Sequence, residues 1–346
     1  MRSLPIRTVT LLCPAMVTGG PQALHQLAFA LNRRALPTQL AYYANGGQLV
    51  REGDAVRCVA PPQNPCLVAY DKYCPVPAER FALTSDHLVV LPEVLAHLHR
   101  AYAPAQAAVW WLSVDNAFHE RAALLNEKVR LELFADRGLR HWAPTFYARE
   151  FLRRQGVPEI AMLSDHVDDQ FTTWQPEGPG PDAVVAYNPR KGGELAAAFF
   201  ARHPDLTPRP ITGLDRRGVW AAFRRARVYV DFSHFPGREF MPREAAASGA
   251  VIFVRNRGAA QFYDDYPLPD AYRFTDAALE DGSLYARVSA ALAEPESHWL
   301  VQESLRQNVR WEAETFERQA DRLVEQLSAV PARRSTVPAL GLPTAP

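Results

Sequence analysis

Short apolar runs alternate with helix-like stretches along most of the chain. In the first half the apolar runs read as strands, in the order RTVTLLC, TQLAYYA, DHLVVLP, AAVWWLS and EIAML. Between them, apolar residues recur at helical spacing over residues 21–34, 93–101, 118–135 and 145–155. Because strands that alternate with helices form parallel sheets covered by helices, this pattern predicts a doubly wound parallel sheet.

The alternation breaks at residues 174–182, where WQPEGPGPD carries three prolines and two glycines and reads as a linker. Behind the linker the strand candidates are AVVAYN, TPRPI, RVYVDF and AVIFV. The helix candidates of this half cover 192–202, 215–225, a short stretch that begins near Pro242, 283–293 and 297–329.

The pattern therefore predicts an α/β protein of two Rossmann-like, doubly wound parallel-sheet domains that face a cleft, with long helices at the C-terminal end. The predicted domains span residues 1–170 and 171–330, the second including the terminal helices, and residues 331–346 read as a disordered tail. Ligands of such sheets bind beyond the carboxyl ends of the strands, so the cleft is the expected site.

Length and composition agree with this picture. A chain of 346 residues with 48% hydrophobic residues suits two domains with a core each. The 38 basic residues equal the 38 acidic ones, so charge gives no reason to expect a nucleic-acid partner, while a local basic patch for peripheral membrane contact stays open. The cysteine pattern favours a reduced, cytoplasmic compartment. No stretch has the length of a transmembrane helix, so attachment at the inner face of the membrane is the alternative.

The sequence shows no recognisable metal motif. The four cysteines are Cys13, Cys58, Cys66 and Cys74. They contain no C-x-x-C pair, which argues against a zinc site. A disulfide among the last three of them stays open. Asp165, Asp168 and Asp169 lie close together, and we interpret Asp168 as fixing a turn. We therefore predict no bound metal and no cofactor.

The segment HFPGREFMPREAAASGAVIFVRN, residues 234–256, carries most of the candidate chemistry. A helix that begins near Pro242 directs its free backbone N–H groups toward the predicted cleft, where an anion is favoured. Gly237 allows the backbone to approach a ligand closely. Glu244 lies in the first turn of the helix, where interaction with the helix dipole is an alternative reason for an acidic residue.

Residues after other strands extend this candidate site. Arg190 and Lys191 follow the strand AVVAYN and open a helix, where a fixed cation suits a diphosphate. Gly19 and Gly20 form a loop before a helix, without the G-x-G-x-x-G spacing of dinucleotide-binding proteins. Asp115 follows the strand AAVWWLS and is expected to face the cleft, with helix capping as an equal alternative.

Several stretches resemble, in the expected order, the nucleotide-sugar glycosyltransferases of the GT-B fold, particularly the retaining family four enzymes of bacterial surface-polysaccharide synthesis. TGGPQALHQLAFALNRRALPTQL resembles the opening glycine loop and helix of that family, and LSDHVDDQF resembles its entry into the second domain. VVAYNPRKGGEL resembles the strand and lysine-glycine pair that begin that domain. YVDFSHFPGREFMPREAAASGAVIFVRNRGAAQFY resembles the donor-site segment, and together these matches extend over nearly the whole chain.

The resemblance implies roles for individual residues. Glu244 matches a glutamate that binds the ribose of the donor. The catalytic candidates are Lys191 and Arg190, together with Asp115, which is proposed from its position after a strand. The other residues expected near the donor are Gly19, Gly20, His234, Gly237, Arg238 and Glu239. The family pattern has another glutamate, eight positions before the one that Glu244 matches. This chain has Pro236 at that position, and Glu239 is the candidate to replace the missing glutamate.

The sequence thus predicts a metal-independent glycosyltransferase that moves a sugar from a nucleoside-diphosphate sugar to a hydroxyl group of a carbohydrate or lipid-linked acceptor. If the resemblance holds, the anomeric configuration is retained, residues 1–170 form the acceptor side and residues 171–330 form the donor side. A nucleotide-sugar epimerase or hydrolase on the same fold is one alternative. A catalytically silent sugar- or partner-binding protein is another, which Pro236 keeps open, while the missing fingerprint disfavours a dinucleotide dehydrogenase.

Overall fold

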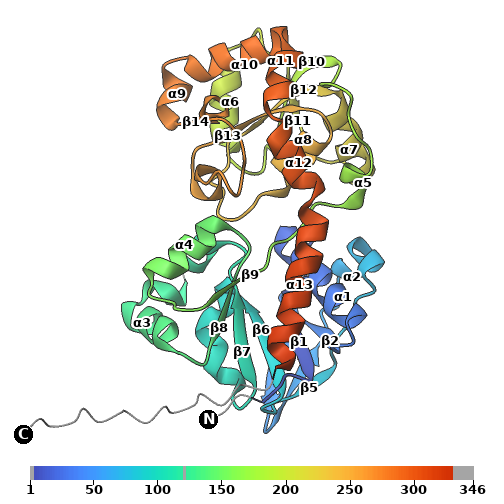
Figure 1. Ribbon diagram of the computed structural model, residues 1–346, viewed down its shortest axis with the longest axis vertical. Helices are drawn as coiled ribbons and strands as arrows, with labels where there is room; N and C mark the ends of the chain where they lie inside the picture. The colour runs from blue at the N-terminus through green and yellow to red at the C-terminus, as the bar shows by residue number, and fades with distance from the viewer. Residues whose placement is uncertain (1–3, 120–121, 330–346) are drawn as a thin grey trace, which may run out of the picture.

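The computed structural model describes residues 4–119 and 122–329, which form two helix-covered parallel sheets (Figure 1). The first sheet has six strands in the order β2-β1-β6-β7-β8-β9. Their bounds are β1 Thr8–Pro14, β2 Thr38–Tyr43, β6 His87–Pro92, β7 Gln106–Trp110, β8 Arg140–Ala143 and β9 Ile160–Met162. The helices of this half are α1 Gly19–Arg33, α2 Cys66–Ala69, α3 Glu127–Ala135 and α4 Phe146–Arg154. Four 3-10 helices join them, η1 Asp71–Tyr73, η2 Glu93–Tyr102, η3 Val114–Phe118 and η4 Ala123–Leu125.

The second sheet has five strands in the order β11-β10-β12-β13-β14. Their bounds are β10 Asp182–Tyr187, β11 Pro208–Pro210, β12 Ala226–Asp231, β13 Val251–Arg255 and β14 Arg273–Phe274. The α-helices of this half, in chain order, are α5 Asp169–Thr172, α6 Gly193–Arg202, α7 Arg216–Arg225, α8 Phe240–Ala247, α9 Asp276–Glu280, α10 Ser283–Ala293, α11 Pro295–Val301 and α12 Glu303–Arg310. Two 3-10 helices, η5 Gly258–Gln261 and η6 Asp270–Tyr272, lie between β13 and β14.

The predicted fold class is confirmed, because all neighbouring strands in both large sheets pair in parallel. The apolar runs form the strand cores, as the full burial of Leu88, Val90 and Ile252 illustrates. The amphipathic pattern of α1 buries Leu24, Leu27 and Leu31 against this core. The predicted tail at 331–346 lies outside the described residues.

A small antiparallel sheet of β3 Gln48–Glu52, β4 Ala55–Val59 and β5 Arg80–Ala82 was not predicted. It is inserted after β2 and precedes β6, so it extends the first half without interrupting the parallel sheet. Its burial is partial, because Val56 and Phe81 are buried while Arg57 and Arg80 are exposed. Such short, mixed strands carry little periodic signal.

The terminal helices differ from the expectation of one helix over 297–329 within the second domain. The stretch divides into α11, α12 and α13 Glu312–Ser328, and α13 crosses to the first half of the molecule (Figure 1). Phe316, Ala320, Leu323 and Leu327 of α13 are buried in the core of the first sheet. The helical pattern predicted the helix, but such a pattern does not identify the sheet that a helix packs against.

Among the described helices, none combines the length and the apolar character that crossing a membrane requires. The four cysteines are free thiols, so the disulfide left open by the sequence is absent from the described residues.

Candidate functional site

The segment before α8 lies against the end of β7, so the two sheets approach each other there. The backbone N–H of Val114 donates to the carbonyl oxygen of Pro236 at 2.9 Å. A Cβ atom on Gly237 would lie 2.1 Å from the carbonyl oxygen of Leu112, a distance that no side chain can occupy. The sequence predicted that Gly237 lets the backbone approach a ligand closely, and that approach stays a prediction. The close neighbour in the structure is the protein's own backbone.

The glycine loop of the first half reaches the same region. A Cβ atom on Gly19 would lie 2.9 Å from a ring carbon of Phe240, the first residue of α8. Gly20 differs, because its nearest neighbour would be Leu112 at 3.9 Å, an ordinary packing distance. The structure therefore brings Gly19, Gly237 and the start of α8 together.

Helix α8 begins at Phe240, two residues earlier than predicted, so that Pro242 lies in its first turn, where proline is tolerated. Ala245, Ala246 and Ala247 are almost fully buried, and α8 contacts both β12 and β13. The small residues thus allow the helix to pack closely on the sheet.

Lys191 and Glu239 form an ion pair, with the ammonium 2.5 Å from the carboxylate. Lys191 comes from the loop after β10, and Glu239 immediately precedes α8 without capping it. Burial raises the pKa of Glu239, and Lys191 opposes that rise. Arg190 is exposed, and its side chain has no ion-pair partner within 4–119 and 122–329.

Glu244 is buried, and its Oε1 accepts a hydrogen bond from Arg216 at 2.7 Å. Burial raises the pKa of Glu244, and the Arg216 guanidinium opposes that rise. The second oxygen, Oε2, is buried without a hydrogen-bond partner in the part of the chain that the structure describes. Arg216 begins α7 after β11, and the sequence analysis did not name it as a site residue. Its position after a strand was the signal that could have identified it.

Arg238 and the neighbouring Arg243 take part in a buried ionic cluster. Arg238 lies 2.9 Å from Glu312, and Arg243 lies 2.7 Å from Glu312 and 2.9 Å from Asp165. Arg238 also donates to Asn308. The guanidinium of Arg238, predicted to lie near the donor, is therefore used in contacts within the protein.

His234 and Asp115 also have partners within the protein. His234 is exposed, and its Nδ1 lies 3.3 Å from Arg255 Nη1. Asp115 is the second residue of η3, and its carboxylate accepts a hydrogen bond from the Tyr147 hydroxyl at 2.6 Å. Asp115 therefore follows the residue, Val114, whose backbone contacts Pro236, and its place in a ligand cleft and its catalytic role stay predictions.

Glu93 is a buried carboxyl group that the sequence analysis missed. It directly follows β6, and burial raises its pKa to about 7, opposed by backbone amides that include those of Ser113 and Leu112. The carboxyl group thus lies behind the segment that touches Gly237. Its signal in the sequence was an acidic residue immediately after the apolar strand HLVVLP.

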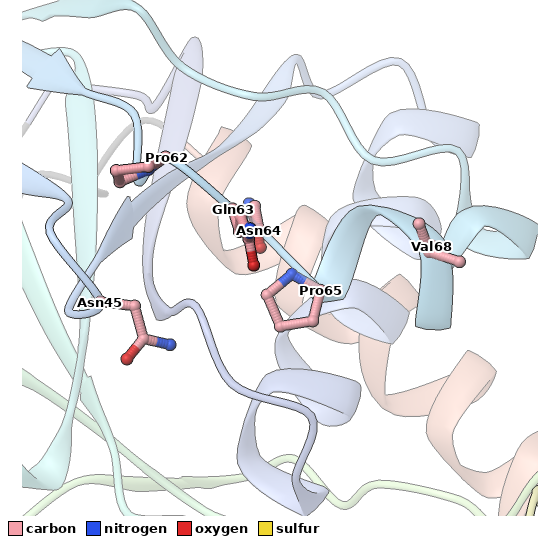
Figure 2. A pocket seen from close by; sticks show the side chains of 6 residues that line it. All are labelled: Asn45, Pro62, Gln63, Asn64, Pro65 and Val68. Atoms are coloured by element: carbon pink, nitrogen blue, oxygen red, sulfur yellow. The ribbon is translucent and has the colours of Figure 1, made fainter.

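A hollow of about 600 Å³ in the first half is lined by none of the predicted site residues (Figure 2). It is lined by amide, proline and valine side chains of the first half, namely Asn45, Pro62, Gln63, Asn64, Pro65 and Val68. Within the described residues, no group of three or more histidine, cysteine, aspartate or glutamate side chains has an arrangement suited to a metal ion.

Solved structures identify the fold. The chain superposes on a sucrose-phosphate synthase from Thermosynechococcus elongatus with a TM-score of 0.65 and 14% identity, over 93% of this chain and 99% of that one. For HepE from Anabaena, in complex with UDP, the TM-score is 0.59 with 10% identity, over 93% of this chain and 100% of that one. For the pneumococcal O-GlcNAc transferase GtfA, in complex with UDP and GlcNAc, the TM-score is 0.61 with 10% identity, over 93% of this chain and 99% of that one.

These similarities show that the chain has the GT-B glycosyltransferase fold, as its motifs predicted. No protein-family model matches the sequence. A search of curated proteins returns no significant match.

Proposed function

We propose that this protein is a glycosyltransferase that uses a nucleoside-diphosphate sugar as donor and a carbohydrate or lipid-linked hydroxyl group as acceptor. The contact between Lys191 and Glu239 carries the proposal, because it holds a lysine ammonium next to the start of α8. A helix start and a nearby cation together favour a diphosphate. The UDP bound to HepE and to GtfA supports this donor class.

Glu244 is the proposed ribose ligand. Its Oε1 is held by Arg216, while its buried Oε2 lacks a donor among the described residues. A ribose hydroxyl group supplies that donor in the proposed complex, and a bond to a charged carboxylate is stronger than one between neutral groups.

Transfer requires that negative charge on the departing diphosphate be stabilised. In the proposed mechanism Lys191 turns from Glu239 to the diphosphate, and its charge matters most as the glycosidic bond breaks. The two halves orient the acceptor hydroxyl against the sugar. We propose retention of configuration, no requirement for a metal, and a cytoplasmic location that includes peripheral attachment to a membrane.

Ligand-dependent melting followed by product analysis tests this function. We expect a nucleoside diphosphate to raise the melting temperature, because a ligand that binds only the folded state stabilises it. Products are then compared with donor alone and with donor plus a panel of saccharide acceptors. Acceptor-dependent glycoside supports the proposal, whereas turnover of the donor alone supports an epimerase or hydrolase. Binding without turnover supports a silent protein.

A further inference from the structure

A hollow of about 400 Å³ opens at the ends of β13 and β14, and its lining includes Arg255, Arg257 and Asp276. Arg255 is the last residue of β13, Arg257 lies two residues beyond it, and Asp276 begins α9 after β14. The hollow therefore lies at the carboxyl edge of the second sheet, where parallel sheets bind ligands. Its volume lies in the range of small-molecule sites.

Two guanidinium groups share one carboxylate in this hollow. Arg255 Nε lies 2.7 Å from one oxygen of Asp276, and Arg257 Nη2 lies 2.6 Å from the other. These arginines lower the pKa of Asp276 to about 2, so the carboxylate is ionised at neutral pH. Two positive charges against one negative charge leave a net positive charge. The side chain of Arg257 is 49% exposed, so its free N–H groups are accessible.

The hollow is fixed to the segment that precedes α8. His234 lies 3.3 Å from Arg255, and the backbone N–H of Ala259 donates to the carbonyl oxygen of Phe235 at 2.9 Å. Gly258 has a φ of +51°, and a Cβ atom on it would lie 2.0 Å from the same oxygen. The wall that carries Arg257 therefore cannot move away from His234 without breaking these contacts.

We propose that Arg255 and Arg257 bind a carboxylate carried by the sugar of the donor. The inference rests on the proposed function and specifies the class of sugar that is transferred. Guanidinium groups recognise planar carboxylates and phosphates through paired N–H donors. Asp276 orients both arginines while neutralising only one of them. Pro236, in the adjoining segment, adds no negative charge that would repel such a sugar.

Calorimetry with matched donors tests this assignment. The ligands are UDP-glucuronate against UDP-glucose, GDP-mannuronate against GDP-mannose, and UDP and GDP alone. We expect a hexuronate donor to bind about tenfold more tightly than its neutral partner, the size of one charge-assisted contact at a half-exposed site. Arg257→Gln should remove this preference and leave the affinity for the bare diphosphate unchanged. Asp276→Asn should strengthen hexuronate binding, because the competing carboxylate charge is lost.

Arg137→Gln, at an exposed arginine of the first half, is the matched control, and melting temperatures establish that each variant is folded. Equal affinities of the parent for hexuronate and hexose donors would overturn the inference while leaving the proposed function intact. Equal weakening of all ligands by Arg257→Gln would also overturn it. If inorganic phosphate alone binds as tightly as the hexuronate donor, the hollow serves a free anion instead of the donor sugar. Failure of every diphosphate to bind the parent would reject the proposed function itself.

Discussion

Arg243 and Glu312 form an ion pair of 2.7 Å in which the two side chains are only 0% and 2% exposed. Arg243 belongs to α8, the helix of Glu244, and Glu312 begins α13, which packs on the other half of the molecule. Arg243 also binds Asp165, where the chain leaves the first half. One guanidinium thus ties the candidate site to both segments that join the halves.

Replacing Arg243 by Met should lower the free energy of unfolding by about 3–5 kcal/mol, because the buried Asp165 loses its ion-pair partner and Glu312 keeps only Arg238. Urea denaturation measures this change. Arg318→Ala is the control, since Arg318 pairs with Glu314 on an exposed helix face and should cost less than about 0.5 kcal/mol. Equal stabilities of the two variants would contradict a structural role for the buried cluster.

Gly237→Ala should destabilise the protein by about 1–3 kcal/mol and weaken diphosphate binding, since its Cβ atom would overlap the Leu112 carbonyl oxygen. Gly20→Ala should be nearly neutral in stability, because its Cβ atom meets only a 3.9 Å contact. Melting temperature and calorimetry compare the two variants. A well-folded Gly237→Ala protein with parental affinity would show that the two halves do not meet as described.

Glu93 should make stability fall as pH rises. Its pKa is about 7 in the folded protein against 4.5 for an ordinary glutamate, so between these values the folded state binds more protons than the unfolded state. The free energy of unfolding should therefore decrease by up to about 3 kcal/mol across this window. Glu93→Gln, which stays neutral, should be similar to the parent near pH 4.5 and more stable above pH 7.

Denaturation at several pH values measures the Glu93 effect. The exposed Glu127→Gln is the control and should follow the parent at every pH. A difference between Glu93→Gln and the parent that does not change with pH would contradict a buried, protonated Glu93.

Metal independence is a separate prediction. We expect glycosyl transfer to continue at an unchanged rate after EDTA treatment, because the proposed charge stabilisation comes from Lys191 and the start of α8. Activity assays before and after chelation test this expectation. Complete loss with EDTA and recovery with Mg²⁺ or Mn²⁺ would show that a metal carries this role.

Most strands of the parallel sheets were predictable because their apolar runs are long enough to be buried and are followed by helical patterns. The edge strand β14 was not predicted, since it has only two residues. The insertion from β3 to β5 was missed, since its strands are short and partly exposed. The position of α13 was also missed, because an amphipathic stripe does not identify its partner. The misses of the short strands have a local cause, and only that of α13 concerns a contact between distant segments.

The same limit applies to the candidate site. The sequence indicated that Lys191 and Glu244 follow strands of one sheet, and such residues gather at its carboxyl edge. It did not indicate that Glu239 binds Lys191, across 48 residues, or that Arg216 binds Glu244, across 28. These pairs depend on side-chain directions that only the packed loops determine.

Calorimetry of Lys191→Ala and Glu244→Gln with nucleoside, monophosphate and diphosphate tests the central claim most directly. We predict that Glu244→Gln weakens all three ligands by about 1.5–3 kcal/mol, because each contains the ribose. Lys191→Ala should weaken the diphosphate by about tenfold or more and leave the nucleoside unchanged, because its charge acts on phosphate. Lys128→Ala, at an exposed lysine of α3, should behave as the parent. If both site variants bind all three ligands as the parent does, α8 is a packed helix with a solvated edge, and the account of a nucleotide-sugar site is wrong.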